Sequence, residues 1–227
     1  MDDKITYNEK YVAFLDILGF KDKIKNSSLE ESIELINIIN NETRFSLNSV
    51  QRINKGLGVD ISVRAFSDCF SISTSFDIEQ LIWSLIQIQR NLVFKSVFVR
   101  GGLSSGRHFE NERMIFSKGL VYAYELAESD KYPRILVDNA MVTTISGDYL
   151  MQLSDRKYFI NYLYDDWGGR ILPDKIMPLH KRVLMEEINN SNDHHILEKY
   201  RWLAEYHNNR AEYCKADKHM IDIDKMF

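Results

Sequence analysis

The sequence has few of the residues that cross-link a chain or interrupt it. Among its 227 residues there are two cysteines, three prolines and ten glycines. Cys69 and Cys214 are far apart and outside any CxxC pair, which excludes a zinc site built from thiolates and is typical of a reducing compartment. The six histidines form no HExxH spacing. Because proline and glycine are scarce, no interdomain linker is obvious.

Long apolar runs and a strong net charge are also missing. No apolar stretch approaches the roughly 20 residues of a membrane-spanning helix, so we expect no direct insertion into a membrane. The N-terminal stretch MDDKITYNEK is polar and acidic, unlike a signal peptide, and predicts a cytoplasmic protein. The net charge of −4 gives no global attraction for nucleic acid, so we expect no nucleic-acid partner; a local basic pocket for a small polyanion remains compatible with it.

The chain does have enough apolar material for a core, since 44% of its residues are hydrophobic and 12 phenylalanines and 12 tyrosines are among them. The spacing of the apolar residues predicts alternating strands and helices. The expected elements are a buried strand over 11–18, a helix over 30–54, a hairpin over 59–75 turning near Ser67 and Asp68, a helix capped by Asp77 and running to Val93, a strand over 97–103 ending in GGLSSG, a helix over 117–128, short strands at RILVD and KYFINYL, and helices from about 179, with a long amphipathic one from His194 to about Lys215.

This order of elements predicts an α+β fold. A helix between each pair of strands, with a hairpin in the middle, fits a ferredoxin-like sheet covered on one face by helices. We expect residues 1–170 to form this core and residues 171–227 to form a helical C-terminal extension packed on it. The aromatic residues of the extension also suit a contact with a partner, and the sequence leaves both interpretations open.

Two aspartates occupy positions where apolar residues are expected. Asp16 is the one charged residue of YVAFLDILGF, and Asp68 lies between aromatic neighbours in RAFSDCF. The first strand and the central hairpin are adjacent in a ferredoxin-like sheet, so the two carboxylates can approach each other. Unpaired, they would repel and their pKa values would rise on burial, whereas a divalent cation removes both penalties. The simpler alternative is that Asp16 caps a loop and Asp68 is a solvated turn residue.

Five stretches, in order over about residues 10–165, resemble the class III nucleotidyl cyclases. FLDILGF resembles the family's first metal-binding motif, and RAFSDCF resembles the hairpin that carries the second metal aspartate. RGGLSSG, from Arg100 to Gly106, resembles the Arg-x-Gly-x-x-x-Gly strand. SKGLVYAYELAES resembles the helix that follows, and PRILVD the strand after it.

The resemblance implies a cyclase catalytic domain over residues 1–170, acting as a head-to-tail homodimer with shared active sites. It implies that Asp16 and Asp68 are the catalytic ligands of two Mn²⁺ or Mg²⁺ ions, helped by the carbonyl of Ile17, and that Phe20 contacts the substrate. The reaction would be attack of a ribose 3′-hydroxyl on the α-phosphate of a nucleoside triphosphate, which releases pyrophosphate.

The resemblance also assigns the residues that select the base. The first is Arg64, four residues before Asp68 and on the same face of its strand. Arginine only donates hydrogen bonds, so it suits a base with carbonyl oxygens. The second position falls near Met114, which offers no strong hydrogen bond. The short architecture resembles that of the bacterial pyrimidine cyclases of antiphage signalling, which implies UTP or CTP as substrate and a separate effector that the cyclic nucleotide activates.

Two positions depart from the family's pattern. Val121 falls where the transition-state asparagine belongs, and Glu125 where the arginine belongs. Candidate replacement cations are Lys118, Arg107 and Arg113, and for each of them the alternative is an ordinary surface charge. The sequence therefore leaves a second hypothesis, a cyclase-like module that binds a nucleotide or senses a signal without turnover, and a third, a purely structural or interaction protein on the same fold.

Overall fold

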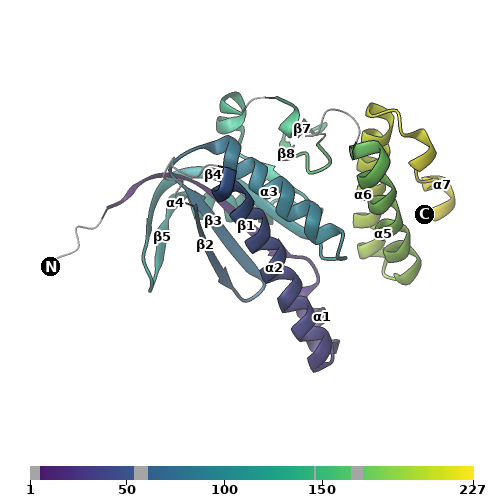
Figure 1. The fold of residues 1–227 in the computed structure, drawn as a ribbon, viewed down its shortest axis with the longest axis horizontal. Helices are drawn as coiled ribbons and strands as arrows, with labels where there is room; N and C mark the ends of the chain where they lie inside the picture. Colours follow the sequence, from purple (N-terminus) through teal and green to yellow (C-terminus); the bar gives the residue numbers. More distant parts are fainter. Residues whose placement is uncertain (1–5, 54–60, 146, 165–170) are drawn as a thin grey trace.

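A mixed sheet with helices on both faces forms the centre of the molecule (Figure 1). The computed structural model describes residues 6–53, 61–145, 147–164 and 171–227. The strands are β1 (Asn8–Ile17), β2 (Ile61–Phe66), β3 (Cys69–Thr74), β4 (Val99–Glu110), β5 (Ile115–Ser117), β6 (Ile135–Val137), β7 (Leu150–Gln152) and β8 (Tyr158–Ile160). The helices are α1 (Phe20–Asn26), α2 (Leu29–Ile53), α3 (Ile78–Val93), α4 (Lys118–Glu128), α5 (Met177–Asn190), α6 (His194–Tyr213) and α7 (Ile223–Met226), with short 3-10 or π turns at Asn139–Thr144, Gly147–Tyr149, Leu172–Ile176 and Asp217–His219.

The strand order confirms the predicted fold class. The sheet runs β2-β3-β1-β4-β6-β8-β7, and β5 pairs with β4 outside this path. Within the first four strands every neighbouring pair is antiparallel. A β-α-β-β-α-β chain arranged in this order is the ferredoxin-like topology. The later strands extend the sheet beyond β4, where β6 pairs in parallel.

The central strand β1 is buried because both of its faces are covered. Ala13 and Leu15 point into the main core, which α3 completes with residues such as Leu81 and Leu85. Phe14, on the other face, packs against Ala123 of α4. This corrects the expectation of helices on one face only. The small alanine side chains of α4 give no strong apolar stripe in the sequence, which is why the second face was not apparent.

Strand β4 is longer than predicted and includes the GGLSSG stretch that was expected to end it. The glycines of this stretch are needed for close approach and do not break the strand. A Cβ at Gly102 would overlap the carbonyl oxygen of Ala123, and one at Gly101 would overlap that of Phe14. Because these glycines have no side chains, α4 and β1 can lie directly against β4.

Other local predictions are confirmed. Asp77 caps α3, because its Oδ1 accepts a hydrogen bond from the amide of Glu79 at 2.9 Å. The hairpin turns at Ser67, which has a left-handed φ of 58°. Part of the region predicted as a hairpin, residues 59 and 60, lies outside the described residues. The sequence did not indicate β7.

The C-terminal helices α5, α6 and α7 gather at one end of the molecule (Figure 1). A second apolar cluster joins them to the sheet, with Leu184 and Leu203 packing together with Leu136 and Phe159 of β6 and β8. The predicted boundary at residue 170 falls at the edge of an undescribed segment. None of the helices in the described ranges is long and apolar enough to cross a membrane.

A chain of hydrogen bonds runs through the middle of this second cluster. Nε2 of His207 lies 2.9 Å from the carbonyl oxygen of His219, and Nδ1 of His207 lies 2.9 Å from Nδ1 of His180. Nε2 of His180 is 2.8 Å from the hydroxyl of Tyr162. With both rings neutral, every nitrogen has one partner. Burial lowers the pKa of His180 well below its ordinary value and lowers that of His207 to about 4.

Candidate functional site

The two aspartates singled out in the sequence lie together at one edge of the sheet. Asp16 is near the end of β1, where its register partners are Cys69 on β3 and Arg100 on β4. Asp68 is in the hairpin turn, and its carbonyl oxygen accepts a hydrogen bond from the amide of Ile17 at 2.9 Å. The end of β1 and the turn of the hairpin are thereby held side by side. The two carboxylates are close enough that the charge of Asp68 acts on Asp16.

Arg100 occupies the space beside Asp16. Its Nε donates to Oδ2 of Asp16 at 2.8 Å, and its guanidinium also donates to the carboxylate of Glu128 and to the carbonyl oxygen of Asp130. The side chains of Asp16 and Arg100 are only 19% and 22% exposed. In the sequence Arg100 stood out as part of a motif, but nothing assigned it to this site. The antiparallel register of β1 and β4 is the signal that identifies it.

Burial raises the pKa of Asp16, although the Arg100 guanidinium works against this shift; the neighbouring carboxylates Asp68 and Glu128 raise it further. Burial, together with the charges of Asp68 and Asp16, also raises the pKa of the Cys69 thiol to about 11. The Cys69 thiol is therefore protonated at neutral pH. The local field disfavours negative charge, and an additional cation would relieve it.

A cleft of about 310 Å³ opens at the two aspartates and is rich in basic side chains. Gly19, with a left-handed φ of 72°, turns the chain from β1 into α1 at its edge. The basic residues that line the cleft are Lys21, Arg100, Lys131 and Lys199. Lys131 pairs with Glu198 at 2.7 Å, while Lys21 and Lys199 make no ion pair with any residue in the described part of the chain. Because Lys199 belongs to α6, the C-terminal extension contributes to this cleft, which the sequence did not predict.

The donor set at the cleft fits a magnesium or manganese ion that is completed by a substrate. Mg²⁺ in nucleotide sites commonly takes one or two carboxylates and several phosphate or water oxygens. Asp16 and Asp68 supply two carboxylates. Over the described ranges no group of three or more histidine, cysteine, aspartate or glutamate side chains could hold a metal alone. Two carboxylates leave the other coordination positions of such an ion to phosphate or water oxygens.

Arg64 belongs to a second polar cluster, centred on Glu110 at the end of β4. Nε of Arg64 donates to Oε1 of Glu110 at 2.6 Å, and Nη2 donates to the carbonyl oxygen of Asn111 at 3.0 Å. Glu110, with 8% of its side chain exposed, also binds the hydroxyl of Ser62, and its Oε2 lies 3.1 Å from Nε2 of His108. These contacts lower the pKa of Glu110 despite its burial. Sequence reasoning missed Glu110 because the strand was expected to end before it.

Phe20 lines the cleft beside the two aspartates, and the other predicted residues lie at the end of β4 that is remote from Asp16 and that also carries Glu110. Arg107 is seven residues beyond Arg100 on the same strand, a separation of roughly 23 Å. Its guanidinium is exposed, with Nε 3.9 Å from Oε1 of Glu9. The other predicted residues are also exposed there: Arg113 and Met114 in the turn after β4, and Lys118 at the start of α4. Within one chain these groups are far from Asp16.

The exposed surface of α4 carries the two positions that depart from the family's pattern. Val121 is 52% exposed, and Glu125 also faces solvent. Tyr122 and Tyr124 lie on the same helix and are 45% and 48% exposed. This surface of α4 therefore presents a valine and two tyrosines beside the Glu125 carboxylate.

The chain resembles known proteins in structure but not in sequence. No family model and no characterised protein sequence matches it. Several solved structures do resemble it, and cyclase domains are among them. The guanylyl cyclase domain of the RhoGC fusion protein from the aquatic fungus Blastocladiella emersonii is 17% identical, with 68% of this chain and 95% of that domain covered and a TM-score of 0.49.

Two bacterial structures show a similar degree of likeness. The adenylyl cyclase CyaB from P. aeruginosa is 15% identical, with 69% and 95% of the two chains covered and a TM-score of 0.45. The adenylate/guanylate cyclase/hydrolase from Silicibacter pomeroyi is 11% identical, with 69% and 96% covered and a TM-score of 0.47. Likeness at this level does not assign a family or an activity, and the fold rests on its own strand order.

Proposed function

We propose that the protein is a metal-dependent nucleotidyl cyclase that converts a nucleoside triphosphate to a 3′,5′-cyclic nucleotide and pyrophosphate. The observation that carries the proposal is the meeting of Asp16 and Asp68 in a cleft that basic side chains also line. Two carboxylates suit divalent cations, and the basic side chains suit phosphate oxygens.

In this proposal Asp16 and Asp68, with the carbonyl of Ile17, would hold two Mn²⁺ or Mg²⁺ ions. When bound, such ions neutralise charge on the α-phosphate and acidify the attacking 3′-hydroxyl. Arg100 now balances the charge of Asp16. A metal would take over that task, and Arg100 would still be held by Glu128 and the Asp130 carbonyl. Its guanidinium could then bind a phosphate oxygen in the same cleft.

The proposed substrate is UTP or CTP. Glu110 and the Asn111 carbonyl hold two nitrogens of Arg64 in place, and 40% of its side chain remains exposed. A guanidinium fixed in this way presents its remaining N–H groups in one direction and suits a carbonyl oxygen of a pyrimidine. The cyclic nucleotide would activate a separate effector in antiphage defence.

A homodimer is part of the proposal because one chain separates the two halves of the site. Arg107, Arg113 and Lys118 lie at the end of β4 that is remote from Asp16, so a head-to-tail partner would have to bring them to the phosphates. The exposed apolar side chains of α4, Val121, Tyr122 and Tyr124, support an interface on that face.

The test is incubation of the purified protein with each of the four nucleoside triphosphates and Mn²⁺, followed by chromatography of the products. We expect a cyclic pyrimidine nucleotide, and loss of product in Asp16→Asn and Asp68→Asn. Asp22→Asn, an exposed residue of α1, is the matched control and should keep full activity. A folded dimer that gives no cyclic product from any of the four would refute the proposal.

Val121 and Glu125 favour one alternative, a module that binds a nucleotide or signal without converting it. A valine and a glutamate on the exposed face of α4 cannot donate hydrogen bonds to a developing phosphate charge as asparagine and arginine can. Calorimetry distinguishes the two functions. Metal-dependent binding of a triphosphate with no turnover would support the alternative.

A further inference from the structure

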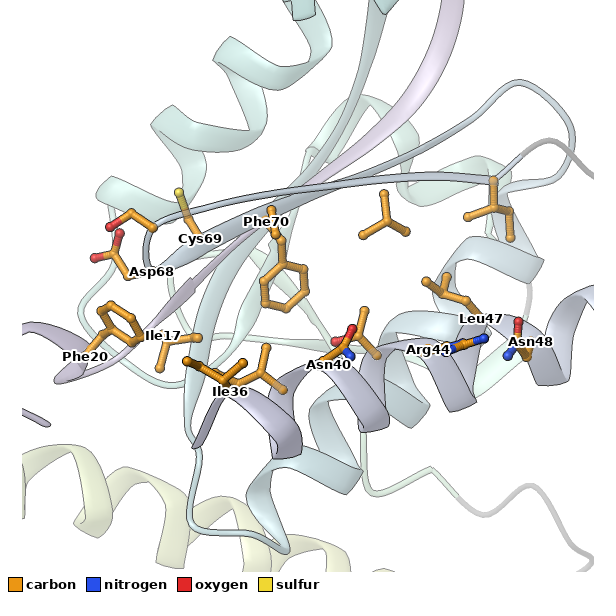
Figure 2. A pocket seen from close by; sticks show the side chains of 16 residues that line it. Ile17, Phe20, Ile36, Asn40, Arg44, Leu47, Asn48, Asp68, Cys69 and Phe70 are labelled. Atoms are coloured by element: carbon orange, nitrogen blue, oxygen red, sulfur yellow. The ribbon is translucent and has the colours of Figure 1, made fainter. Parts of the chain in front are cut away.

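A second and larger cavity lies between α2 and the β2–β3 hairpin (Figure 2). Its volume is about 660 Å³, within the range of small-molecule sites. The wall formed by the sheet includes Ile61, Val63 and Phe70, and the wall formed by the helix includes Ile36 and Leu47. The cavity is therefore mainly apolar and large enough for a compact organic molecule.

The cavity exists because α2 leans on α3 and leaves the hairpin uncovered. Leu35, Ile38 and Ile39 of α2 pack against the main core, in which α3 contributes most of the helical residues. Ile61 and Val63 on β2 are left half-buried, and Ala65 is exposed. Protein interiors are normally packed to the density of organic crystals. A space of this size between apolar walls is therefore suited to a guest.

The polar groups that α2 contributes to the cavity all lie on one side of that helix. Asn40, Thr43, Arg44 and Asn48 recur at helical spacing and line it together. The Oγ1 atom of Thr43 is buried and has no hydrogen-bond partner among the described residues. Leaving a buried hydroxyl unpaired costs about 1–3 kcal/mol. A ligand atom that accepts a hydrogen bond from Thr43 would remove this cost.

Arg44 adds a positive charge to the same side. Its side chain is exposed, and it makes no ion pair with any residue in the described part of the chain. At the other end of the cavity Asp68 carries a carboxylate, next to Phe20 (Figure 2). The two ends therefore have opposite polarity. A guest with a negative head would place that head at Arg44 and its apolar body toward Phe70 and Phe20.

We infer that this cavity binds a small amphipathic carboxylate, with its head at Arg44 and Thr43 and its apolar body between α2 and the hairpin. The inference does not depend on the proposed cyclase activity. The cavity and the metal cleft share Ile17, Phe20 and Asp68. A ligand in the cavity therefore touches the residues that position the cleft, which gives it a direct route to influence events there.

The test is isothermal titration calorimetry with decanoate and with the neutral decanol, each below the concentration at which it aggregates, in the absence of metal and nucleotide. We expect one decanoate to bind per chain. Arg44→Gln should weaken decanoate about tenfold, the loss of one charge-assisted contact, and should leave decanol unchanged. Ala65→Phe, which fills the cavity from its exposed rim, should abolish binding of both. Arg182→Gln, an exposed arginine on α5, is the matched control for charge and should change neither.

Decanoate binding that is equal in wild type and Arg44→Gln would overturn the assignment of the head group. Binding that survives Ala65→Phe, or no binding of either compound to the wild type, would overturn the site itself. Thermal melts check that each variant is folded. If Ala65→Phe is not, Thr43→Val replaces it, and this variant should weaken decanoate severalfold without changing the secondary structure. Because no nucleotide is present, failure here is separate from failure of the cyclase assay.

Discussion

We expect Glu110→Gln to lower the free energy of unfolding by about 3 kcal/mol at pH 7. In the wild type this buried carboxylate accepts hydrogen bonds from Ser62, Arg64 and His108. Each bond to a charged group contributes about 1 kcal/mol more than a neutral one. A glutamine would turn its amide N–H₂ toward one of these donors, and this clash of two buried donors costs about 1–2 kcal/mol, while each of the other two bonds loses about 1 kcal/mol. The expected loss in the free energy of unfolding is therefore the sum over at least three contacts of Glu110.

The effect should depend on pH with a defined sign. The contacts of Glu110 hold its pKa below the ordinary value of 4.5, so the unfolded chain binds the proton more readily. Its contribution is complete above about pH 4.5 and is lost as the pH falls through the folded-state pKa. Urea unfolding at a series of pH values measures this. With a slope of about 2 kcal/mol/M, the midpoint at pH 7 should fall by about 1.5 M.

Glu112→Gln is the matched control, since Glu112 is two residues away and exposed. It should shift the midpoint by less than about 0.3 M at pH 7. A loss for Glu110→Gln that is no greater than for the control would refute the reasoning. So would a loss that stays constant as the pH falls well below 4.5.

Three further outcomes are expected. Asp16→Asn should change the free energy of unfolding by no more than about 1 kcal/mol, because the lost ion pair with Arg100 is offset by relief of desolvation and of repulsion from Asp68. Cyclase activity should nevertheless fall at least about 100-fold. Unfolding and product assays on one preparation compare the two effects. His207→Gln should reduce the slope of stability against pH between 6.5 and about 4 by up to about 1.4 kcal/mol per pH unit, because the buried neutral ring makes stability fall with falling pH; His180 keeps its own contribution, and urea titrations at each pH measure the slope. Gly102→Ala should destabilise by several kcal/mol, since the added Cβ overlaps the backbone of α4, while Gly147→Ala, in open space at positive φ, should cost about 1 kcal/mol by thermal unfolding.

The sequence predicted those parts of the fold that depend on local chemistry. Asp77 marked the start of α3 because a side-chain cap acts within two residues. The turn at Ser67 and the buried strand before Gly19 could also be predicted, because each follows from a short-range sequence pattern. The ferredoxin-like order then followed from the succession of elements.

What the sequence did not indicate depends on register and on close packing. Arg100 lies opposite Asp16 only because β1 and β4 pair in one particular register. Glu110 was missed because the glycines before it were interpreted as the end of a strand, whereas they make room for α4. Lys199 lines the same cleft as Asp16, although more than 180 residues separate the two in the sequence. No short-range pattern encodes such a contact.

The central claim is that Asp16 and Asp68 together form a site for divalent cations. The most direct measurement is a crystal structure with Mn²⁺ and a non-hydrolysable pyrimidine triphosphate, with anomalous scattering used to locate the metal. The account predicts manganese bound to carboxylate oxygens of both aspartates, with Arg100 released from Asp16 and turned toward a phosphate. An intact ion pair between Arg100 and Asp16 at saturating Mn²⁺, with no manganese at either aspartate, would contradict it.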